Sequence, residues 1–399
     1  MNIASNNPQT FGNQQQYVKY SSTKRYSGLL SALLCVIAGI AFSNAAFASA
    51  AKLQQPREFN MNNVEQHNFR LTKESQLHQQ FNSVIAPFWQ QQVQHITFNG
   101  SNNTAPDSAT NTVTLNGAYI LHPNAIGSIV LVSGRTESAL KYRELVYDLY
   151  QNQYSVFILD HRGQGQSQRL TNNPNKGYVT DFTDYVADLK TFYDNYVKPN
   201  SQHTPTLLAH SMGCAISGLY LAQYPNDFAK AVLSSPMFGI KAPITPKQAK
   251  VIIGIAQSLN TFFSDSPWYF IGQGNYKQEA FAGNPITSSE IRFQYHNQVL
   301  SEYPETRLGG VTYHWLDKAI DAMQTVLDLA PSIKTPTLIL QSGNDRIVDN
   351  AAQVPVCNAM PHCQLQVIAD AEHELFMEQD QYRTPALQAA LQFFAEGSN

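Results

Sequence analysis

The chain has 399 residues, enough for one large α/β domain or two smaller domains with a substantial core. Its formal net charge is −3, and its basic residues form no cluster along the sequence. Because proteins that bind nucleic acids need a clustered basic excess, this composition excludes nucleic acid as an expected partner.

The N-terminal segment has the features of an export signal. Residues 1–27 are polar and end in basic residues just before the apolar run 28–42. That run is shorter than the roughly 20 residues that a membrane-spanning helix prefers, and small residues in A-x-A arrangement follow it. We predict an export signal with a polar leader over residues 1–50, which places the protein in the periplasm or cell envelope. An uncleaved signal anchor in the inner membrane is the alternative.

Export affects whether the cysteines are expected to form a disulfide, because disulfides persist in oxidising compartments. Cys357 and Cys363 are close enough in sequence to pair if the turn at Pro361 brings them together. Cys214 is then expected to be a small buried residue rather than a reactive thiol. His362 lies beside Cys363, but further ligands at suitable spacing are missing, so we predict no metal site.

The middle of the chain alternates between strand and helix patterns. Residues 51–90 predict a flexible lead-in that closes with a helix. The core is predicted over residues 91–238 and 331–399, with eight strands at 94–98, 113–121, 128–133, 154–160, 206–209, 229–234, 335–341 and 364–368. Its helices are predicted at 139–151, 182–197, 212–221 and 384–394. This alternation predicts an α/β fold in which a mostly parallel sheet has helices on both faces.

The alternation stops after the sixth predicted strand. Residues 239–330 instead predict three amphipathic helices, at 246–263, 290–303 and 312–327, with many aromatic residues among them. We predict a helical cap that lies over the strand ends as a lid and whose apolar inner surface suits an acyl chain. A plain helical packing layer is the alternative.

A serine occupies the tight turn between the strand 206–209 and the helix 212–221. The residues from Ala209 to Gly213 read A-H-S-M-G, which matches the G-x-S-x-G pattern except at its first position. Small residues are needed there because larger side chains would collide in so sharp a bend. The pattern predicts that Ser211 is a nucleophile at the rim of the sheet, and a serine at an ordinary helix N-terminus is the alternative.

Two further residues at predicted strand ends complete a catalytic set. Asp345 follows the seventh strand and His373 follows the eighth. A serine nucleophile needs a base, and the base needs an acid that fixes its tautomer. Because the order Ser211, Asp345, His373 is that of the α/β-hydrolase architecture, we predict these three residues as a triad, with Asp349 and Asp370 as alternative acids.

The loops after the third and fourth strands border the same predicted site. Gly134 lets the backbone turn toward Ser211, so the amides of Arg135 and Met212 are the predicted donors to an oxyanion. An ordinary strand-to-helix loop is equally compatible with this segment. The glycines of residues 160–167 do not complete a dinucleotide-binding pattern, and we expect Arg162 in that loop to hold loops in place.

Several segments resemble those of the family of lysophospholipase L2 and monoacylglycerol-lipase-like α/β-hydrolases. They are SGRTESALKYRELVYDLY, DHRGQGQSQR, LAHSMGCAIS, SSPMFGI, GGVTYHW and VDN. The likeness extends from about Phe81 to the C-terminus and includes the same alanine at the first position of the serine motif. The chain departs from the family at Cys214, where a glycine is usual, and in its exported N-terminus.

The resemblance implies an enzyme that cleaves the fatty-acyl ester of a lysophospholipid, or of a monoacylglycerol, at a membrane surface without a metal or organic cofactor. It also implies substrate contacts at Arg162, His314 and Trp315. The position of Arg135 and Arg162 beside the site suggests that either could face a lipid phosphate. The alternatives are an esterase or peptidase with other acyl substrates and a non-catalytic envelope protein that binds lipid.

Overall fold

The computed structural model describes residues 55–59, 68–101 and 112–396. The predicted export signal at residues 1–50 lies outside these ranges. Within them, no helix combines the length and the apolar character that crossing a bilayer requires.

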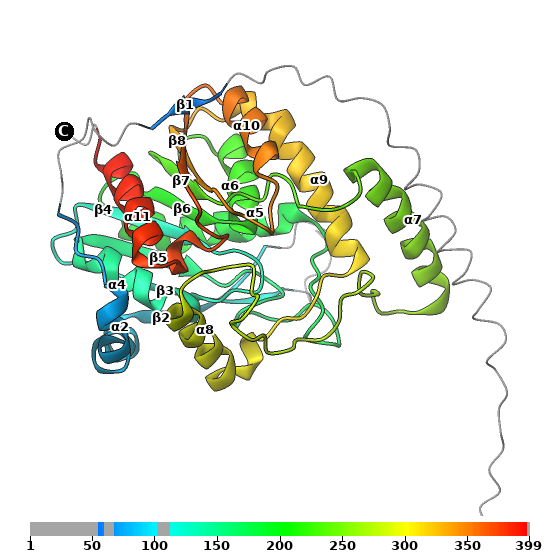
Figure 1. The fold of residues 1–399 in the computed structure, drawn as a ribbon, viewed down its shortest axis with the longest axis horizontal. Helices are drawn as coiled ribbons and strands as arrows, with labels where there is room; N and C mark the ends of the chain where they lie inside the picture. The colour runs from blue at the N-terminus through cyan, green and yellow to red at the C-terminus, as the bar shows by residue number, and fades with distance from the viewer. Residues whose placement is uncertain (1–54, 60–67, 102–111, 397–399) are drawn as a thin grey trace, which may run out of the picture. The chain divides into compact units, whose positions relative to one another are not determined.

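A nine-stranded sheet forms the centre of the fold (Figure 1). Its strands lie in the order β1-β9-β8-β7-β6-β4-β5-β3-β2. β3 pairs antiparallel with β2 and with β5, and the other pairs are parallel, as the strand–helix alternation predicted. The strands are β1 (Arg57–Glu58), β2 (Gln94–Asn99), β3 (Thr114–Ile120), β4 (Gly127–Val132), β5 (Tyr154–Leu159), β6 (Thr206–His210), β7 (Ala231–Ser234), β8 (Thr337–Ser342) and β9 (Cys363–Ile368).

The sheet has one strand more than the eight predicted, because β1 adds to the edge strand β9. Arg57 pairs with Gln364 and Glu58 with Leu365. Both residues of β1 are exposed, so no alternation of apolar and polar residues marks the strand in the sequence. Only backbone pairing with β9 defines it.

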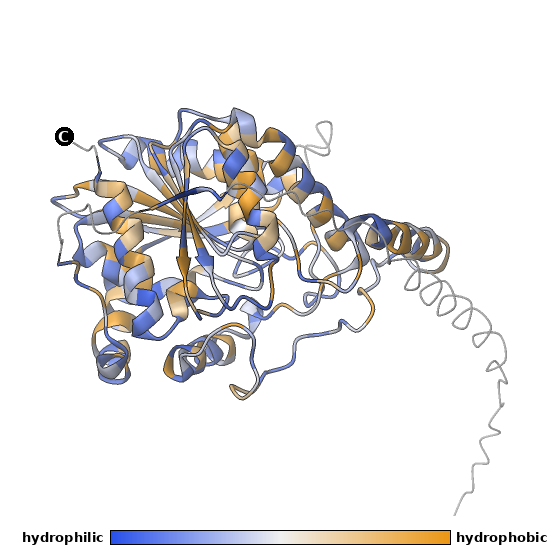
Figure 2. Cartoon of the chain, turned by 45° about the horizontal axis from the view of Figure 1, so that its top comes forward, coloured by the Kyte–Doolittle hydropathy of each residue, from blue (hydrophilic) through white to orange (hydrophobic). Residues whose placement is uncertain are grey.

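Helices cover both faces of the sheet and create two apolar cores. In β4, Val130 and Val132 face one core while Ile129 and Leu131 face the other, as the period of two in a strand requires. Figure 2 shows the hydrophobic residues that run along the central strands. One face is covered by α5 (Phe182–Phe192), α6 (Met212–Gln223), α9 (Tyr313–Leu329) and α10 (Asn350–Ala359), and the other by α3 (Ala86–Gln92), α4 (Arg143–Gln151) and α11 (Asp380–Ala395).

The segment predicted as a cap divides into helices with different packing. α9 buries Trp315, Ala319 and Met323 in the same core as α6, so it belongs to the layer over the sheet rather than to a lid. α8 (Glu290–Glu302) packs through Ile291 and Tyr295 on the N-terminal helix α2 (Glu74–Gln80) and the π-helical turn that follows it. The third helix, α7 (Pro246–Phe263), lies on the side of α9 away from the sheet (Figure 1).

The structure also settles the pairing of the cysteines. Cys357 in α10 and Cys363 at the start of β9 form a disulfide, with their Cα atoms 5.3 Å apart. The turn that brings them together contains Pro361. Cys214 is a free, buried thiol, as predicted.

Removing the disulfide should destabilise the fold. A bridge across a sequence separation of 6 restricts the unfolded chain, which corresponds to about 2 kcal/mol of unfolding free energy. Reductant should therefore lower the unfolding free energy of the wild type, measured with urea, by that amount. The double variant Cys357→Ala/Cys363→Ala should be as unstable as the reduced wild type and insensitive to reductant. Equal stability of the wild type with and without reductant would contradict this prediction.

Candidate active site

Ser211 lies at the sharp turn between β6 and α6. Its backbone has φ 51° and ψ −115°, a strained conformation for a residue other than glycine. The turn is held by backbone hydrogen bonds: the Ser211 amide donates to the Ser234 carbonyl over 3.0 Å, and the Ser211 carbonyl accepts from the Met237 amide over 3.1 Å. Such a turn presents the serine hydroxyl at the rim of the sheet.

Gly213 allows α6 to begin directly against the end of β4. A Cβ atom at this position would lie 2.2 Å from the Val132 carbonyl oxygen and 2.6 Å from that of Ser133, too close for any side chain. Ala209, at the other end of the motif, is fully buried in the core without displacing the turn. The tight turn therefore requires a glycine at position 213 but tolerates alanine at position 209.

The structure brings the three predicted triad residues together. His373 Nε2 lies 2.9 Å from Ser211 Oγ, and His373 Nδ1 lies 2.7 Å from Asp345 Oδ2. The Asp345 carboxylate accepts a hydrogen bond from Nδ1–H, so the unprotonated Nε2 is free to accept the proton of the serine hydroxyl. All three residues are buried, and Ser211 keeps only 9% of its surface exposed.

Asp345 is the acid that contacts the histidine. Its other oxygen, Oδ1, accepts from the amides of Ile347 and Val348 over 2.8 and 2.9 Å. Burial by itself would raise its pKa, but the hydrogen bond to His373 and these two amides outweigh burial, so the pKa of Asp345 lies below its ordinary value. Asp345 is therefore ionised at neutral pH.

The two alternative acids, Asp349 and Asp370, occupy other structural positions. Asp349 is the N-cap of α10 and accepts from the Ala351 amide over 3.0 Å. Asp370 occupies a turn with φ 61°. In the described part of the chain neither forms a hydrogen bond with His373, so the geometry favours Asp345.

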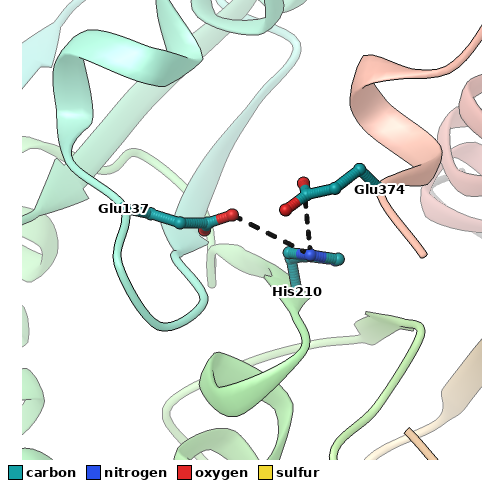
Figure 3. Close-up of side chains that lie close together, drawn as sticks. All are labelled: Glu137, His210 and Glu374. Atoms are coloured by element: carbon teal, nitrogen blue, oxygen red, sulfur yellow. Dashed lines mark ion pairs between the residues drawn. The ribbon is translucent and has the colours of Figure 1, made fainter. Parts of the chain in front are cut away.

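A cluster of buried charged residues lies beside the triad, and Figure 3 shows three of its members, Glu137, His210 and Glu374. The Lys141 ammonium contacts the Glu137 carboxylate and lies 2.7 Å from Glu374 Oε2. His210 Nε2 lies 3.3 Å from that same Glu374 oxygen and 3.9 Å from Glu137 Oε1. Since the rings of His210 and His373 are 4.9 Å apart, the cluster packs directly against the triad.

The cluster balances its own charges. Burial opposes ionisation of Glu374, but Lys141 and His210 outweigh it and lower the pKa of Glu374 well below the usual range. In the same way, Glu374 and Glu137 overcome burial and raise the pKa of His210. The ligand atoms of Glu137, His210 and Glu374 lie within 4.8 Å of one another, which would suit a metal ion, but the Lys141 ammonium already contacts both carboxylates.

Sequence reasoning missed this cluster. Two of its members directly adjoin triad residues, His210 before Ser211 and Glu374 after His373. Glu137 and Lys141 are spaced four residues apart after β4, as an ion pair on a helix would be. These spacings were the available signals, but only the fold brings the three segments together.

The predicted oxyanion donors come from neighbouring segments. β4 and β6 are adjacent and parallel, with Val132 paired to Ala209, so the loop that contains Arg135 runs beside the start of α6. The Met212 amide is at the first position of α6, where helix amides lack an intrahelical acceptor. The Gly134 amide donates to the Glu137 carboxylate, which anchors the loop that carries Arg135.

The structure places Arg162, one of the predicted substrate contacts, against carboxylates of α5 and a backbone carbonyl. Its guanidinium donates to both carboxylate oxygens of Asp188 over 2.7 Å and to the Ser101 carbonyl over 2.6 Å, and it lies 3.2 Å from Asp184. These partners occupy its donors. Arg162 holds loops together, as the position of its loop also predicted.

Arg135 and the two predicted substrate residues of α9 lie in one region. Trp315 is buried, and the Arg135 guanidinium lies over its indole ring, 5.3 Å from the centroid. The His314 ring stacks on Tyr178, and its Nε2 lies 3.0 Å from the Thr180 carbonyl oxygen. Substrate contact by His314 and Trp315 stays a prediction.

Comparison with known proteins places the chain among related sequences. The profile of the family Hydrolase_4, described as serine aminopeptidase, S33, matches residues 123–380. Lysophospholipase L2 of Escherichia coli K12 is 39% identical over 277 residues, which cover 67% of this chain and 79% of that protein. Human monoglyceride lipase is 29% identical over 225 residues, covering 56% of this chain and 67% of the human chain.

A solved structure supports the same fold. The crystal structure of a soluble variant of monoglyceride lipase from Saccharomyces cerevisiae, in complex with a substrate analogue, has a TM-score of 0.57 at 17% identity and covers 77% of this chain and 96% of the yeast chain. At that identity the match speaks to the fold alone. The sequence profile and the similarity to the E. coli protein show that this chain belongs to the serine aminopeptidase S33 family of α/β-hydrolases.

Proposed function

We propose that this protein hydrolyses the fatty-acyl ester of lysophospholipids. The observation that carries the proposal is the hydrogen-bonded series from Ser211 through His373 to Asp345. Similarity to E. coli lysophospholipase L2 supports the substrate class. Monoacylglycerol is the alternative substrate, supported by similarity to human monoglyceride lipase.

The geometry supports acyl transfer to the serine. His373 Nε2 accepts the Ser211 proton while Asp345 stabilises the imidazolium that forms. The serine oxygen attacks the ester carbonyl, and the amides of Met212 and Arg135 are the proposed donors to the oxyanion. The protonated His373 then gives its proton to the departing alcohol.

Water completes the cycle. With the alcohol gone, the acyl group is esterified to Ser211, and His373 acts as base a second time by taking a proton from the attacking water. Collapse of the second oxyanion releases the fatty acid and restores the serine. The same steps would serve an esterase with other acyl substrates, so turnover of defined lipids decides the substrate.

We further propose that α7 brings the enzyme to a membrane surface. α7 packs on α9 through Ala249, Ile253 and Ala256 and contains no acidic residue. Its far end exposes Phe262 and Phe263, with 83% and 70% of their surfaces open to solvent. Figure 2 shows hydrophobic residues along α7 beyond the sheet. An amphipathic helix with exposed aromatic residues suits the boundary between headgroups and acyl chains.

We also propose that the protein is exported and acts in the cell envelope. The support is the apolar run 28–42, with its preceding basic residues and the small residues that follow it. The disulfide between Cys357 and Cys363 supports the same compartment, because disulfides are maintained outside the reducing cytosol. An uncleaved anchor in the inner membrane is the alternative.

Ser211→Ala should abolish hydrolysis of lysophosphatidylcholine. Because the serine and histidine act as a unit, kcat should fall by about a millionfold, and labelling by a fluorophosphonate should disappear. An unchanged rate would show that Ser211 is not the nucleophile, whereas absence of turnover by the wild type would leave a non-catalytic lipid-binding protein as the better description.

Asp345→Asn should lower kcat by about 10⁴-fold, because an amide can hold the wrong tautomer of His373. Asp349→Asn is the matched control, since asparagine also caps a helix and Asp349 does not contact His373. Equal losses in the two variants would argue against Asp345 as the acid of the triad.

Phe262→Ser/Phe263→Ser should weaken binding to phospholipid vesicles. Burying one phenylalanine contributes about 1.5–3 kcal/mol, so losing two should lower affinity by at least about tenfold. Sedimentation with vesicles, using protein that lacks residues 1–50, measures the effect. Ile126→Ser is the control, because Ile126 is also exposed, at 59%, but lies outside α7. Similar vesicle binding by both variants would remove α7 from the proposal.

Deletion of the apolar run 28–42 should retain the protein in the cytosol. Cell fractionation should find the full chain in the envelope fraction and the deletion variant with cytosolic markers. Identical fractionation of the two proteins would refute export by this segment.

A further inference from the structure

Arg135 follows β4 in a loop beside the turn that carries the nucleophile. The loop from Ser133 to Arg135 leaves β4 next to the turn at Ser211, because Val132 and Ala209 are paired in adjacent parallel strands. A Cβ atom at Gly134 would lie 3.1 Å from His210 Cδ2, so the residue before Arg135 touches the residue before Ser211. Arg135 thus follows a segment that approaches the strand end before Ser211, and its side chain reaches the Gly309 carbonyl and the Trp315 ring.

The Arg135 guanidinium lacks an anionic partner among the described residues. It donates to the Gly309 carbonyl and lies over the Trp315 ring, while its Nε atom is shielded from water and has no hydrogen-bond partner. Burial lowers the pKa of Arg135 to about 10, opposed only by the neighbouring Tyr185 and Tyr269. The charge is therefore desolvated without a carboxylate to balance it.

Four arginines of the described chain are buried, and one of them, Arg143, donates to the Leu140 carbonyl and lies over the Phe81 ring. The other three each pair with two carboxylates: Arg162 with Asp184 and Asp188, Arg292 with Glu144 and Asp380, and Arg383 with Glu144 and Asp148. Removing an unpaired charge from water is costly, so a cation without such a partner needs a reason. An anion that arrives with the substrate supplies one.

The surroundings hold the guanidinium in place. A Cβ atom at Gly177 would lie 2.7 Å from Arg135 Nη2, so the chain approaches the side chain closely on that side. The indole ring of Trp315 supports the opposite part of the group. With Nη2 directed to the Gly309 carbonyl, Nη1 makes no hydrogen bond within the described residues and is left to donate to a ligand.

We infer that Arg135 binds the phosphate of a lysophospholipid headgroup and is a specificity-determining residue of this site. The inference rests on the proposed function and selects between its two substrates. A lysophospholipid carries a phosphate a few bonds from its ester, whereas a monoacylglycerol is neutral. A planar guanidinium matches the oxygens of a phosphate and binds it through charge-assisted hydrogen bonds.

The test compares two esters that carry the same acyl chain. The full-length protein in mixed micelles is assayed for kcat/KM on lysophosphatidylcholine and on monoacylglycerol, as wild type, Arg135→Met and Arg135→Lys. Arg135→Met should lower kcat/KM about 10- to 100-fold more for lysophosphatidylcholine than for monoacylglycerol, the effect of losing a charged hydrogen bond to the phosphate. Arg135→Lys should recover part of the loss because it restores the positive charge.

Lys277→Met is the matched control for a change in net charge. Lys277 is exposed on the insertion between β7 and β8, which also carries Trp315. It should leave the ratio of the two kcat/KM values unchanged. The proposed oxyanion donor at position 135 is a backbone amide, which all three residues at this position retain. A general loss of oxyanion stabilisation would therefore lower kcat/KM for both substrates to a similar extent.

A third arm identifies the source of the phosphate. Glycerophosphocholine, the headgroup without an acyl chain, should inhibit monoacylglycerol cleavage by the wild type and not by Arg135→Met, and inorganic phosphate should inhibit less. Inhibition by inorganic phosphate alone would overturn the assignment to a lipid headgroup.

The failures are distinguishable. If the wild type cleaves neither ester, the proposed function falls and the inference falls with it. If the wild type cleaves both and Arg135→Met lowers both equally, or neither, the inference alone is overturned. If Arg135→Met does not fold, judged by circular dichroism, Arg135→Lys must still change the ratio of the two substrates, and an unchanged ratio overturns the inference.

Discussion

The site depends on one steric constraint, the contact between the start of α6 and the end of β4. Gly213 has no side chain, so α6 can begin against the Val132 carbonyl, and Ser211 is held at φ 51° in the turn before it. The parallel pairing of β6 with β7, β7 with β8 and β8 with β9 then brings Asp345 and His373 to the same edge of the sheet. This register brings the triad residues within hydrogen-bonding distance of one another, because the carboxyl ends of parallel strands lie at the same edge of a sheet.

The charged groups at the carboxyl edge of the sheet differ in how their charges are compensated. Asp345 is stabilised as an anion by His373 and two amides, and Glu374 by Lys141 and His210, so these buried groups hold opposite charges within contact distance. Arg135 is different because its partners are a carbonyl and an aromatic ring. A guanidinium held by a carbonyl and an aromatic ring, with no carboxylate partner among the described residues, is suited to a substrate that contributes a negative charge.

The helices of the insertion between β7 and β8 pack in different ways. α9 is part of the layer that covers the sheet, and it also places Trp315 under the Arg135 guanidinium. α7 rests on α9 and leaves aromatic residues exposed at its far end. One insertion thus links a buried face next to the catalytic edge with an apolar surface suited to lipid, which fits an enzyme whose substrate must leave a membrane to react.

The sequence by itself determined the parts that depend on neighbouring residues. Strand and helix alternation, the tight turn at Ser211 and the order of the three triad residues are written in local patterns, because periodicity and steric demand act within a few positions. Contacts between distant segments were decided only by the tertiary structure. They include the two-residue strand β1, the choice of Asp345 over Asp349 and the bonding of Arg162 to Asp188. The ion cluster around Lys141 belongs with them, since no local pattern states which side chains from separate loops will meet.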